Sequence, residues 1–142
     1  WTLGSFSYGY IEKKINNKKL IITFSSMFMA FLISLLCISN INNLIFILII
    51  FSLLGFFGAF TLILMAHYRV LFEEEIIGKV LTTANLFNFF GVFITQWFTG
   101  IVIFNLNEKY GFSITNSFNI AFMIIVLCLL TSTIFYLKTD EV

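Results

Sequence analysis

The stretch EEEIIGKVLTTANLFNFFGVFITQWFTG, residues 73–100, decides how the rest of the chain is interpreted. It opens with three acidic residues and a Gly-Lys step, and continues as a long apolar run interrupted by amide and hydroxyl side chains. Because an α-helix advances about 100° per residue, five of these polar side chains fall on one face: Asn85, Asn88, Thr95, Gln96 and Thr99. An apolar helix with one polar stripe is typical of a membrane protein with a polar interior.

The composition of the whole chain agrees with this interpretation. Hydrophobic residues make up 60% of the 142 residues and charged residues only 11%, and the mean hydropathy is +1.02. Soluble domains carry about 25% charged residues. The sequence therefore predicts an all-α integral membrane protein that contacts the lipid bilayer.

Four apolar runs are each long enough to cross the hydrocarbon, which takes about 20 helical residues. They cover residues 20–39, 44–66, 79–106 and 117–137. Residues 1–10 have the composition of a partial fifth span and are not preceded by an initiator methionine, so we expect the C-terminal part of a longer protein. Because the chain has no proline, any bend within a span requires Gly or Ser.

The segments between these runs are predicted to be loops at residues 11–19 and 67–78 and a short turn at residues 40–43. Asn116 or Ser117 is the expected cap of the last helix. Seven basic residues fall on one side of the predicted membrane: Lys13, Lys14, Lys18, Lys19, Arg69, Lys79 and Lys138. Lys109 stands alone on the other side. Because basic loops stay in the cytoplasm, we expect a cytoplasmic C-terminus and a plasma (bacterial inner) membrane.

Small residues occur at positions where membrane helices are expected to pack closely. Gly55, Gly58 and Ala59 lie in the second run, and Gly91 and Gly100 lie in the third. Side chains of this size let two helix backbones approach each other. We expect helix packing at these five positions.

The sequence offers little for catalysis. No Asp, Glu, Lys or Arg lies in the central part of the four runs, and His67 is the only histidine. A single histidine without an aligned carboxylate is weak evidence for a catalytic or metal site, so an interfacial or loop-ordering role is expected for it. We predict no enzyme, no cofactor, no metal site and no nucleic-acid partner.

Two interpretations of the polar stripe remain open. Its side chains either hydrogen-bond to a neighbouring helix, an interaction of about 0.6 kcal/mol on average, or line a hydrated substrate pathway. Asn85, Asn88, Gln96 and Thr99 are the candidate pathway residues. The acidic residues before them are either stabilised by the helix dipole, paired with Arg69, or part of a cytoplasmic latch.

Two segments resemble the C-terminal half of major facilitator superfamily permeases. Residues 9–19, GYIEKKINNKK, are similar to a G-x-x-x-D-R-x-G-R-R motif between two helices, with Glu12 near the acid position and lysines in place of arginines. Residues 75–79, EIIGK, followed by Asn85, Gly91 and Gly100, are similar to the start of the penultimate helix of that family, without its usual proline.

The resemblance implies that the four complete spans are the last four of twelve and that residues 1–10 end the eighth. It implies transport of a small-molecule solute by alternating access, together with the N-terminal half of the same protein. A cytoplasmic gate would contain Glu12, Lys13, Lys14, Arg69, Glu75 and Lys79. The second and third complete spans would approach the central cavity, and any coupling carboxylate would lie upstream.

A different class of function remains open. Four apolar spans without catalytic groups also suit a small non-catalytic subunit or assembly factor of a membrane complex. A membrane enzyme would need its catalytic residues upstream of this chain. The amount of preceding sequence in the reading frame discriminates between these hypotheses.

Overall fold

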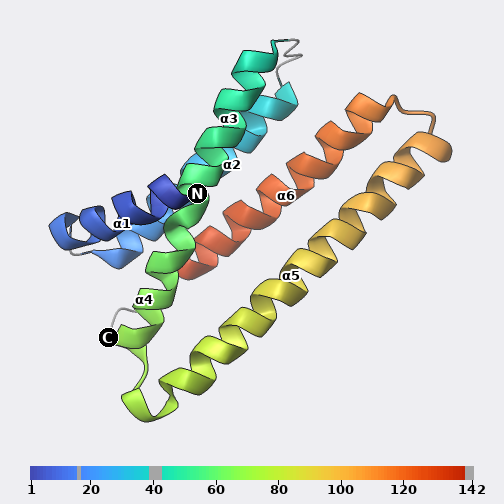
Figure 1. Ribbon diagram of the computed structural model, residues 1–142. Helices are drawn as coiled ribbons and strands as arrows, with labels where there is room; N and C mark the ends of the chain where they lie inside the picture. Colours follow the sequence, from blue (N-terminus) through green and yellow to red (C-terminus); the bar gives the residue numbers. More distant parts are fainter. Residues whose placement is uncertain (16, 39–42, 140–142) are drawn as a thin grey trace.

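The computed structural model describes residues 1–15, 17–38 and 43–139, and every element in these ranges is helical (Figure 1). The elements in chain order are α1 (Thr2–Ile15), α2 (Lys18–Ile38), α3 (Leu44–Phe57), the 3-10 turn η1 (Gly58–Phe60), α4 (Thr61–Leu71), α5 (Glu74–Glu108) and α6 (Ile114–Leu137). Four segments have the length and apolarity to cross a membrane: Lys18–Cys37, Leu44–Leu71, Glu74–Glu108 and Ile114–Leu137. The predicted all-α membrane protein is confirmed.

The core lies where α2 meets α6 on one side and α1, η1 and α4 on the other. Tyr8, Ile21, Ile22, Ala59 and Ile63 form its buried cluster. On α2 the buried side chains recur at the spacing of helical turns, which is what a helix needs to bury one face.

The second apolar span consists of two α-helices joined by a short 3-10 turn. α3 ends at Phe57, η1 covers Gly58–Phe60, and α4 continues the direction of the chain to Leu71. The hydroxyl of Thr61 donates a hydrogen bond to the carbonyl of Gly58 over 3.2 Å. A short 3-10 turn inside a helix tightens the backbone locally, and here it begins at a glycine, in a chain without proline.

The helices extend beyond the runs predicted from apolarity. α1 continues to Ile15, α4 continues to Leu71, and α5 begins at Glu74 rather than Lys79. Most of the two predicted loops, residues 11–19 and 67–78, is therefore helical, and that prediction was wrong. Apolarity marks the part of a helix that suits hydrocarbon, whereas Lys and Glu are good helix formers, and acidic residues in a first turn are stabilised by the helix dipole.

Two predictions concern helix caps and turns. The cap of α6 is Ser113, whose Oγ accepts a hydrogen bond from the N–H of Asn116 over 3.2 Å, so the assignment to Asn116 or Ser117 was wrong. The connection before it turns at Gly111, whose φ of 67° favours glycine. Of the predicted turn at residues 40–43, only Asn43 is among the described residues, and its side chain caps α3.

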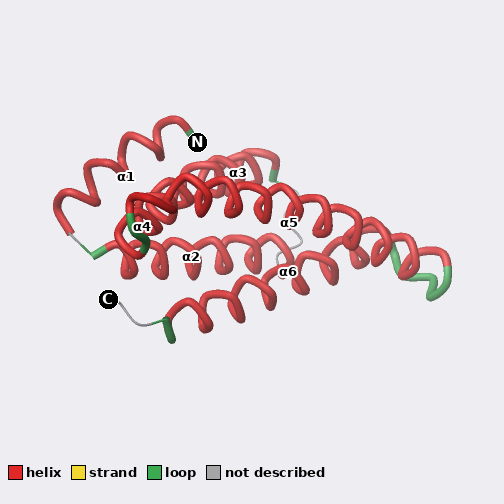
Figure 2. The backbone as a smooth tube through the Cα atoms, turned by 90° about the horizontal axis from the view of Figure 1, so that it is seen from below, coloured by secondary structure: helices red, strands yellow, loops and turns green. Residues whose placement is uncertain are grey.

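α5 and α6 run antiparallel to each other, and α6 packs along α2, whereas α5 stands apart from α2 (Figures 1 and 2). α5 packs against α6 and, near its beginning, against α4. None of its 35 residues is buried. This long, exposed helix carries the polar stripe.

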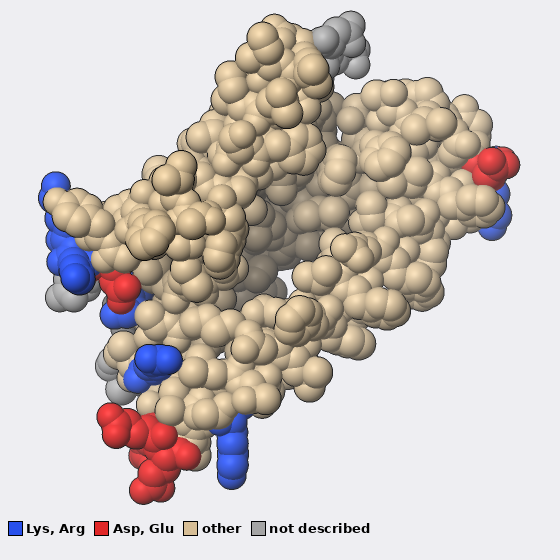
Figure 3. Space-filling view, viewed as in Figure 1, with Lys and Arg blue, Asp and Glu red and all other residues tan. Residues whose placement is uncertain are grey.

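Charged side chains gather at two ends of the molecule, with an uncharged surface between them (Figure 3). In the larger group, two lysines form contacts between the ends of different helices. Lys18 pairs with Glu12 and joins α2 to α1, and Lys19 donates a hydrogen bond to the carbonyl of Thr139, just beyond α6. Glu108 and Lys109 lie at the other end of α5. This distribution suits a molecule whose middle is surrounded by hydrocarbon.

Candidate functional site

The polar stripe lies on the face of α5 that packs against its neighbours. Leu81, which lines the hollow at the junction with α4, and Ala84 are half-buried, and Asn85 and Asn88 follow them by one turn each. Residues one turn apart share a helix face. The stripe is therefore on the inner face of α5 at this end.

The same holds toward the other end of α5, where it packs against α6. Thr99, Ile103 and Leu106 are half-buried there. Gln96 precedes Ile103 by two turns, and Thr95 precedes Thr99 by one. Half-buried residues thus lie on the same face of α5 before and after the stripe along the chain. The stripe therefore faces the neighbouring helices.

Between these two packed ends, the stripe is open. Asn85, Asn88, Thr95 and Gln96 are exposed. The hydroxyl of Thr99 donates to the carbonyl of Thr95 over 2.6 Å, within α5 itself. Among the described residues, no hydrogen bond joins the three side-chain amides to another residue. Figure 3 shows the surface hollowed between the part that contains α3 and the arm formed by α5 and α6.

The small residues divide into two groups. Gly55 and Gly58 lie against Trp1, where an added Cβ would be 3.7 Å and 3.8 Å from the nearest Trp1 atoms, and Ala59 is fully buried. At Gly91 and Gly100 a Cβ would meet no atom of the described chain within 4 Å. At Gly55 and Gly58 such a Cβ would make ordinary van der Waals contact, and helix packing at the five positions stays a prediction.

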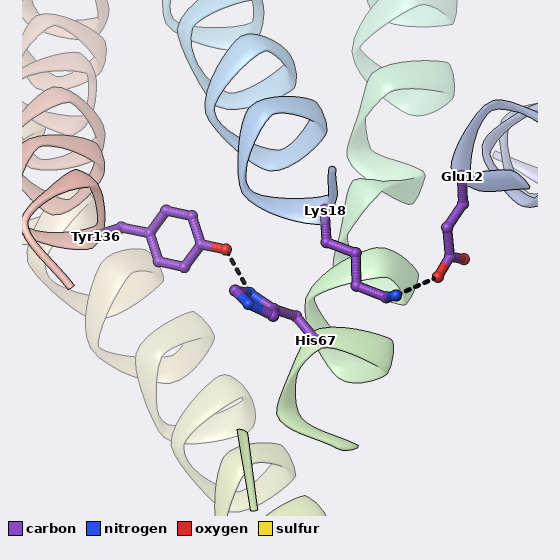
Figure 4. A network of polar contacts seen from close by, with 4 residues as sticks. All are labelled: Glu12, Lys18, His67 and Tyr136. Atoms are coloured by element: carbon purple, nitrogen blue, oxygen red, sulfur yellow. Dashed lines mark hydrogen bonds and ion pairs between the residues drawn. The ribbon is translucent and has the colours of Figure 1, made fainter. Parts of the chain in front are cut away.

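The residues predicted to form a cytoplasmic gate lie at one end of the molecule but are not joined into a network. Among the residues that the structure describes, the one ion pair is Glu12 with Lys18, at 3.0 Å (Figure 4). Lys13 and Lys14 are exposed at the end of α1. Lys18 was not among the predicted gate residues, although it supplies the partner of Glu12.

The remaining gate candidates surround the junction of α4 and α5. Arg69 and Glu74 line the same hollow there, with Phe72 between the two helices. No ion pair joins Arg69 to an acidic side chain in the described ranges. Glu75 and Lys79 are exposed on the first turns of α5. Glu73, Glu74 and Glu75 lie at the N-terminus of α5, where carboxylates are stabilised by the helix dipole.

Sequence reasoning missed a set of hydrogen bonds between helices. The Nδ1 of His67 on α4 lies 2.7 Å from the hydroxyl of Tyr136 on α6 (Figure 4). Thr133 donates to Ser26 over 3.0 Å and joins α6 to α2. Tyr8 and Ser25 share a hydrogen bond of 2.5 Å between α1 and α2. Polar residues within apolar runs were the available signal, since such groups bond across helices in membranes.

His67 lies in a helix, so of the two expected roles, interfacial or loop-ordering, the second was wrong. It lies inside α4, within an apolar segment long enough to span a membrane, and is only 8% exposed. Its ring packs edge-on against that of Tyr136, with the centroids 6.0 Å apart. His67 holds two helices together rather than ordering a loop.

The described residues bring together no group of three or more His, Cys, Asp or Glu side chains that could hold a metal ion. Comparisons with known protein families, with characterised proteins and with solved structures found no match.

Proposed function

We propose that this chain is part of a membrane transporter that moves a small polar solute across the bilayer by alternating access. The observation that carries the proposal is the polar stripe of α5. Three amides lie on the inner face of a long apolar helix, are exposed, and have no hydrogen-bonding partner among the described residues.

The physical argument starts from the energy of polar groups in a membrane. Placing an amide in hydrocarbon without a hydrogen bond costs a free energy of about 4 kcal/mol. Asn85, Asn88 and Gln96 therefore need water, a solute or another polar surface. Each amide both donates and accepts hydrogen bonds, which suits hydroxyl, carbonyl and amide groups on a solute.

The resemblance to major facilitator superfamily permeases adds a mechanism to this surface. In that architecture the solute pathway lies between two six-helix halves, and the N-terminal half would face the inner side of α5. The stripe carries no carboxylate, so proton or ion coupling belongs to another part of the protein.

The orientation follows from the distribution of charge. We assign the end with Lys13, Lys14, Lys18, Lys19 and Lys138 to the cytoplasm and the end with Lys109 to the opposite side, in a plasma (bacterial inner) membrane. Arg69 and Lys79 belong to the same basic end. The C-terminus is then cytoplasmic, and α5 begins there.

One observation also favours a second candidate, a four-span subunit of a membrane complex. No residue of α5 is fully buried within this chain, and a subunit that docks through this helix would show the same feature. Such a subunit would bury the amides against a fixed partner, whereas a transporter needs them accessible to solute.

Substitution of the amides tests the proposal. In the protein expressed from its complete gene, Asn88→Leu and Gln96→Leu together are expected to lower solute uptake about tenfold, because two hydrogen bonds of about 0.7 kcal/mol each are lost. Uptake is measured in proteoliposomes with a panel of labelled sugars and amino acids.

Asn105→Leu is the matched control, because the amide of Asn105 donates to the carbonyl of Ile101 within α5 and lies off the stripe. The control should retain normal uptake. Equal uptake by the double variant and the control would contradict the pathway role. A protein that transports nothing in the panel but co-purifies with a partner bound along α5 would favour the subunit.

A further inference from the structure

A groove separate from the polar stripe runs between the beginning of α2 and the end of α6. Its volume is about 450 Å³, and its apolar wall consists of Leu20, Phe24 and Met27 of α2 with Leu137 of α6. The three α2 residues follow one another by one helical turn and are between 54% and 61% exposed. We call this space the α2–α6 groove.

Polar donors stand at one end of the α2–α6 groove. Asn17 and Lys19 line it there. The side-chain oxygen of Asn17 accepts a hydrogen bond from the N–H of Leu20 over 2.8 Å, which leaves its NH₂ group free to donate. Lys19 donates to the carbonyl of Thr139 over 2.5 Å, and an ammonium has two further donors.

The electrostatic balance at this end favours an anion. No carboxylate of a described residue lines the groove. The nearby acid Glu12 is paired with Lys18 at 3.0 Å, whereas Lys19 contacts a carbonyl and forms no ion pair with a carboxylate among the residues that the structure describes. Lys138 caps the adjacent end of α6 and adds an exposed cation to the half-buried Lys19.

The apolar wall favours an anion that carries a hydrocarbon chain over a small inorganic anion. Leu20, Phe24 and Met27 belong to Lys18–Cys37, a segment with the length and apolarity of a membrane span. The groove therefore begins at the charged end of the molecule and continues along the part that suits hydrocarbon. A free phosphate would leave the apolar wall unused, and a hydrocarbon chain alone would leave the donors unused.

We propose that the α2–α6 groove binds one phospholipid with an anionic headgroup, such as phosphatidylglycerol. The phosphate contacts Lys19 and Asn17, and one acyl chain lies along Leu20, Phe24 and Met27. Basic pockets between membrane helices bind anionic headgroups for the same reason, since the charge is recognised where the helix leaves the hydrocarbon. The site is independent of solute transport.

Native mass spectrometry of the detergent-solubilised protein, expressed from its complete gene, tests this site. The protein is titrated with phosphatidylglycerol and with phosphatidylcholine of identical acyl chains. We expect one phosphatidylglycerol to bind about tenfold more tightly than phosphatidylcholine, because both carry the phosphate but the quaternary ammonium of choline cancels its charge and is repelled by Lys19 and Lys138. Equal binding of the two lipids would overturn the proposal.

Two variants and one control locate the lipid. Lys19→Gln should lower phosphatidylglycerol affinity about tenfold, while Lys14→Gln, which removes an exposed charge outside the groove, should leave it unchanged. Met27→Trp fills the apolar wall without touching the contact of Lys19 with Thr139, and should also weaken binding. Wild-type affinity in both Lys19→Gln and Met27→Trp would overturn the assignment.

A third arm separates a lipid from a free phosphate. Glycerol phosphate at millimolar concentration, which has the headgroup chemistry without acyl chains, should not displace bound phosphatidylglycerol. Displacement at that concentration would show that the site recognises phosphate alone, and would overturn the role of the apolar wall.

Discussion

At the scale of single residues, the interior of this membrane protein is held by side chains that bond from one helix to another. His67 and Tyr136 are separated by 69 positions in the sequence, and Ser26 and Thr133 by 107. No local pattern relates such positions, so the sequence indicates polar residues inside apolar runs without indicating their partners. The stripe of α5 could be predicted because its members share one helix, whose geometry is fixed.

Replacing Tyr136 by phenylalanine tests the contribution of the contact between α4 and α6. Tyr136→Phe keeps the ring beside His67 but removes the hydroxyl, so we expect the free energy of unfolding to fall by about 1 kcal/mol. Thermal unfolding in detergent measures the change. Tyr10→Phe is the control, because Tyr10 is 70% exposed. Equal melting temperatures for the two variants would contradict a stabilising hydrogen bond.

At the scale of elements, the existence of each helix was predictable and its ends were not. Four apolar runs indicated four spans, because about 20 such residues cross a bilayer. The ends of α1, α4 and α5 lie in charged sequence that remains helical. Ser113 caps α6 from a position four residues before the predicted apolar run, residues 117–137. The first residues of the apolar run are therefore not the cap.

The crossing of α1 over η1 depends on the absence of a side chain at Gly4. A Cβ there would collide with the carbonyl oxygen of Phe56 and lie 3.0 Å from the Cβ of Ala59. We expect Gly4→Ala to lower the free energy of unfolding by about 1–3 kcal/mol, since overpacking forces the two segments apart. Thermal unfolding of the purified variant gives the value.

Gly9 provides the comparison on the same helix. A Cβ at Gly9 would meet nothing within 4 Å. Gly9→Ala should therefore stabilise α1 by about 0.5–1 kcal/mol, because alanine loses less backbone freedom than glycine in a helix. If both substitutions destabilise the protein equally, the tight crossing is not the cause.

At the scale of the whole molecule, charge and apolarity divide the surface into two polar ends and an uncharged middle. The asymmetry of basic residues was visible in the sequence, because a count by loop needs only the order of the spans. The open inner face of α5 was not visible, since it depends on how far α5 stands from α2 and α3.

Cysteine labelling tests the orientation assigned from this asymmetry. Lys109→Cys and Lys138→Cys are introduced separately into a protein in which Cys37 and Cys128 are replaced by alanine; both lysines are exposed. A membrane-impermeant maleimide added to intact cells should label Lys109→Cys and spare Lys138→Cys. Both should react after permeabilisation. Labelling in the reverse order would place the basic end outside the cell.

The length of α5 has a mechanical consequence. At 1.5 Å per residue, a helix of this size is about 52 Å long, compared with a hydrocarbon thickness of about 30 Å. α5 is therefore long enough to extend past the hydrocarbon at its ends. A tilt of 10° about its midpoint displaces each tip by about 4–5 Å, close to the 5.4 Å pitch of a helix. A small tilt at the contacts of α5 with α4 and α6 would thus move its ends by about one helical turn.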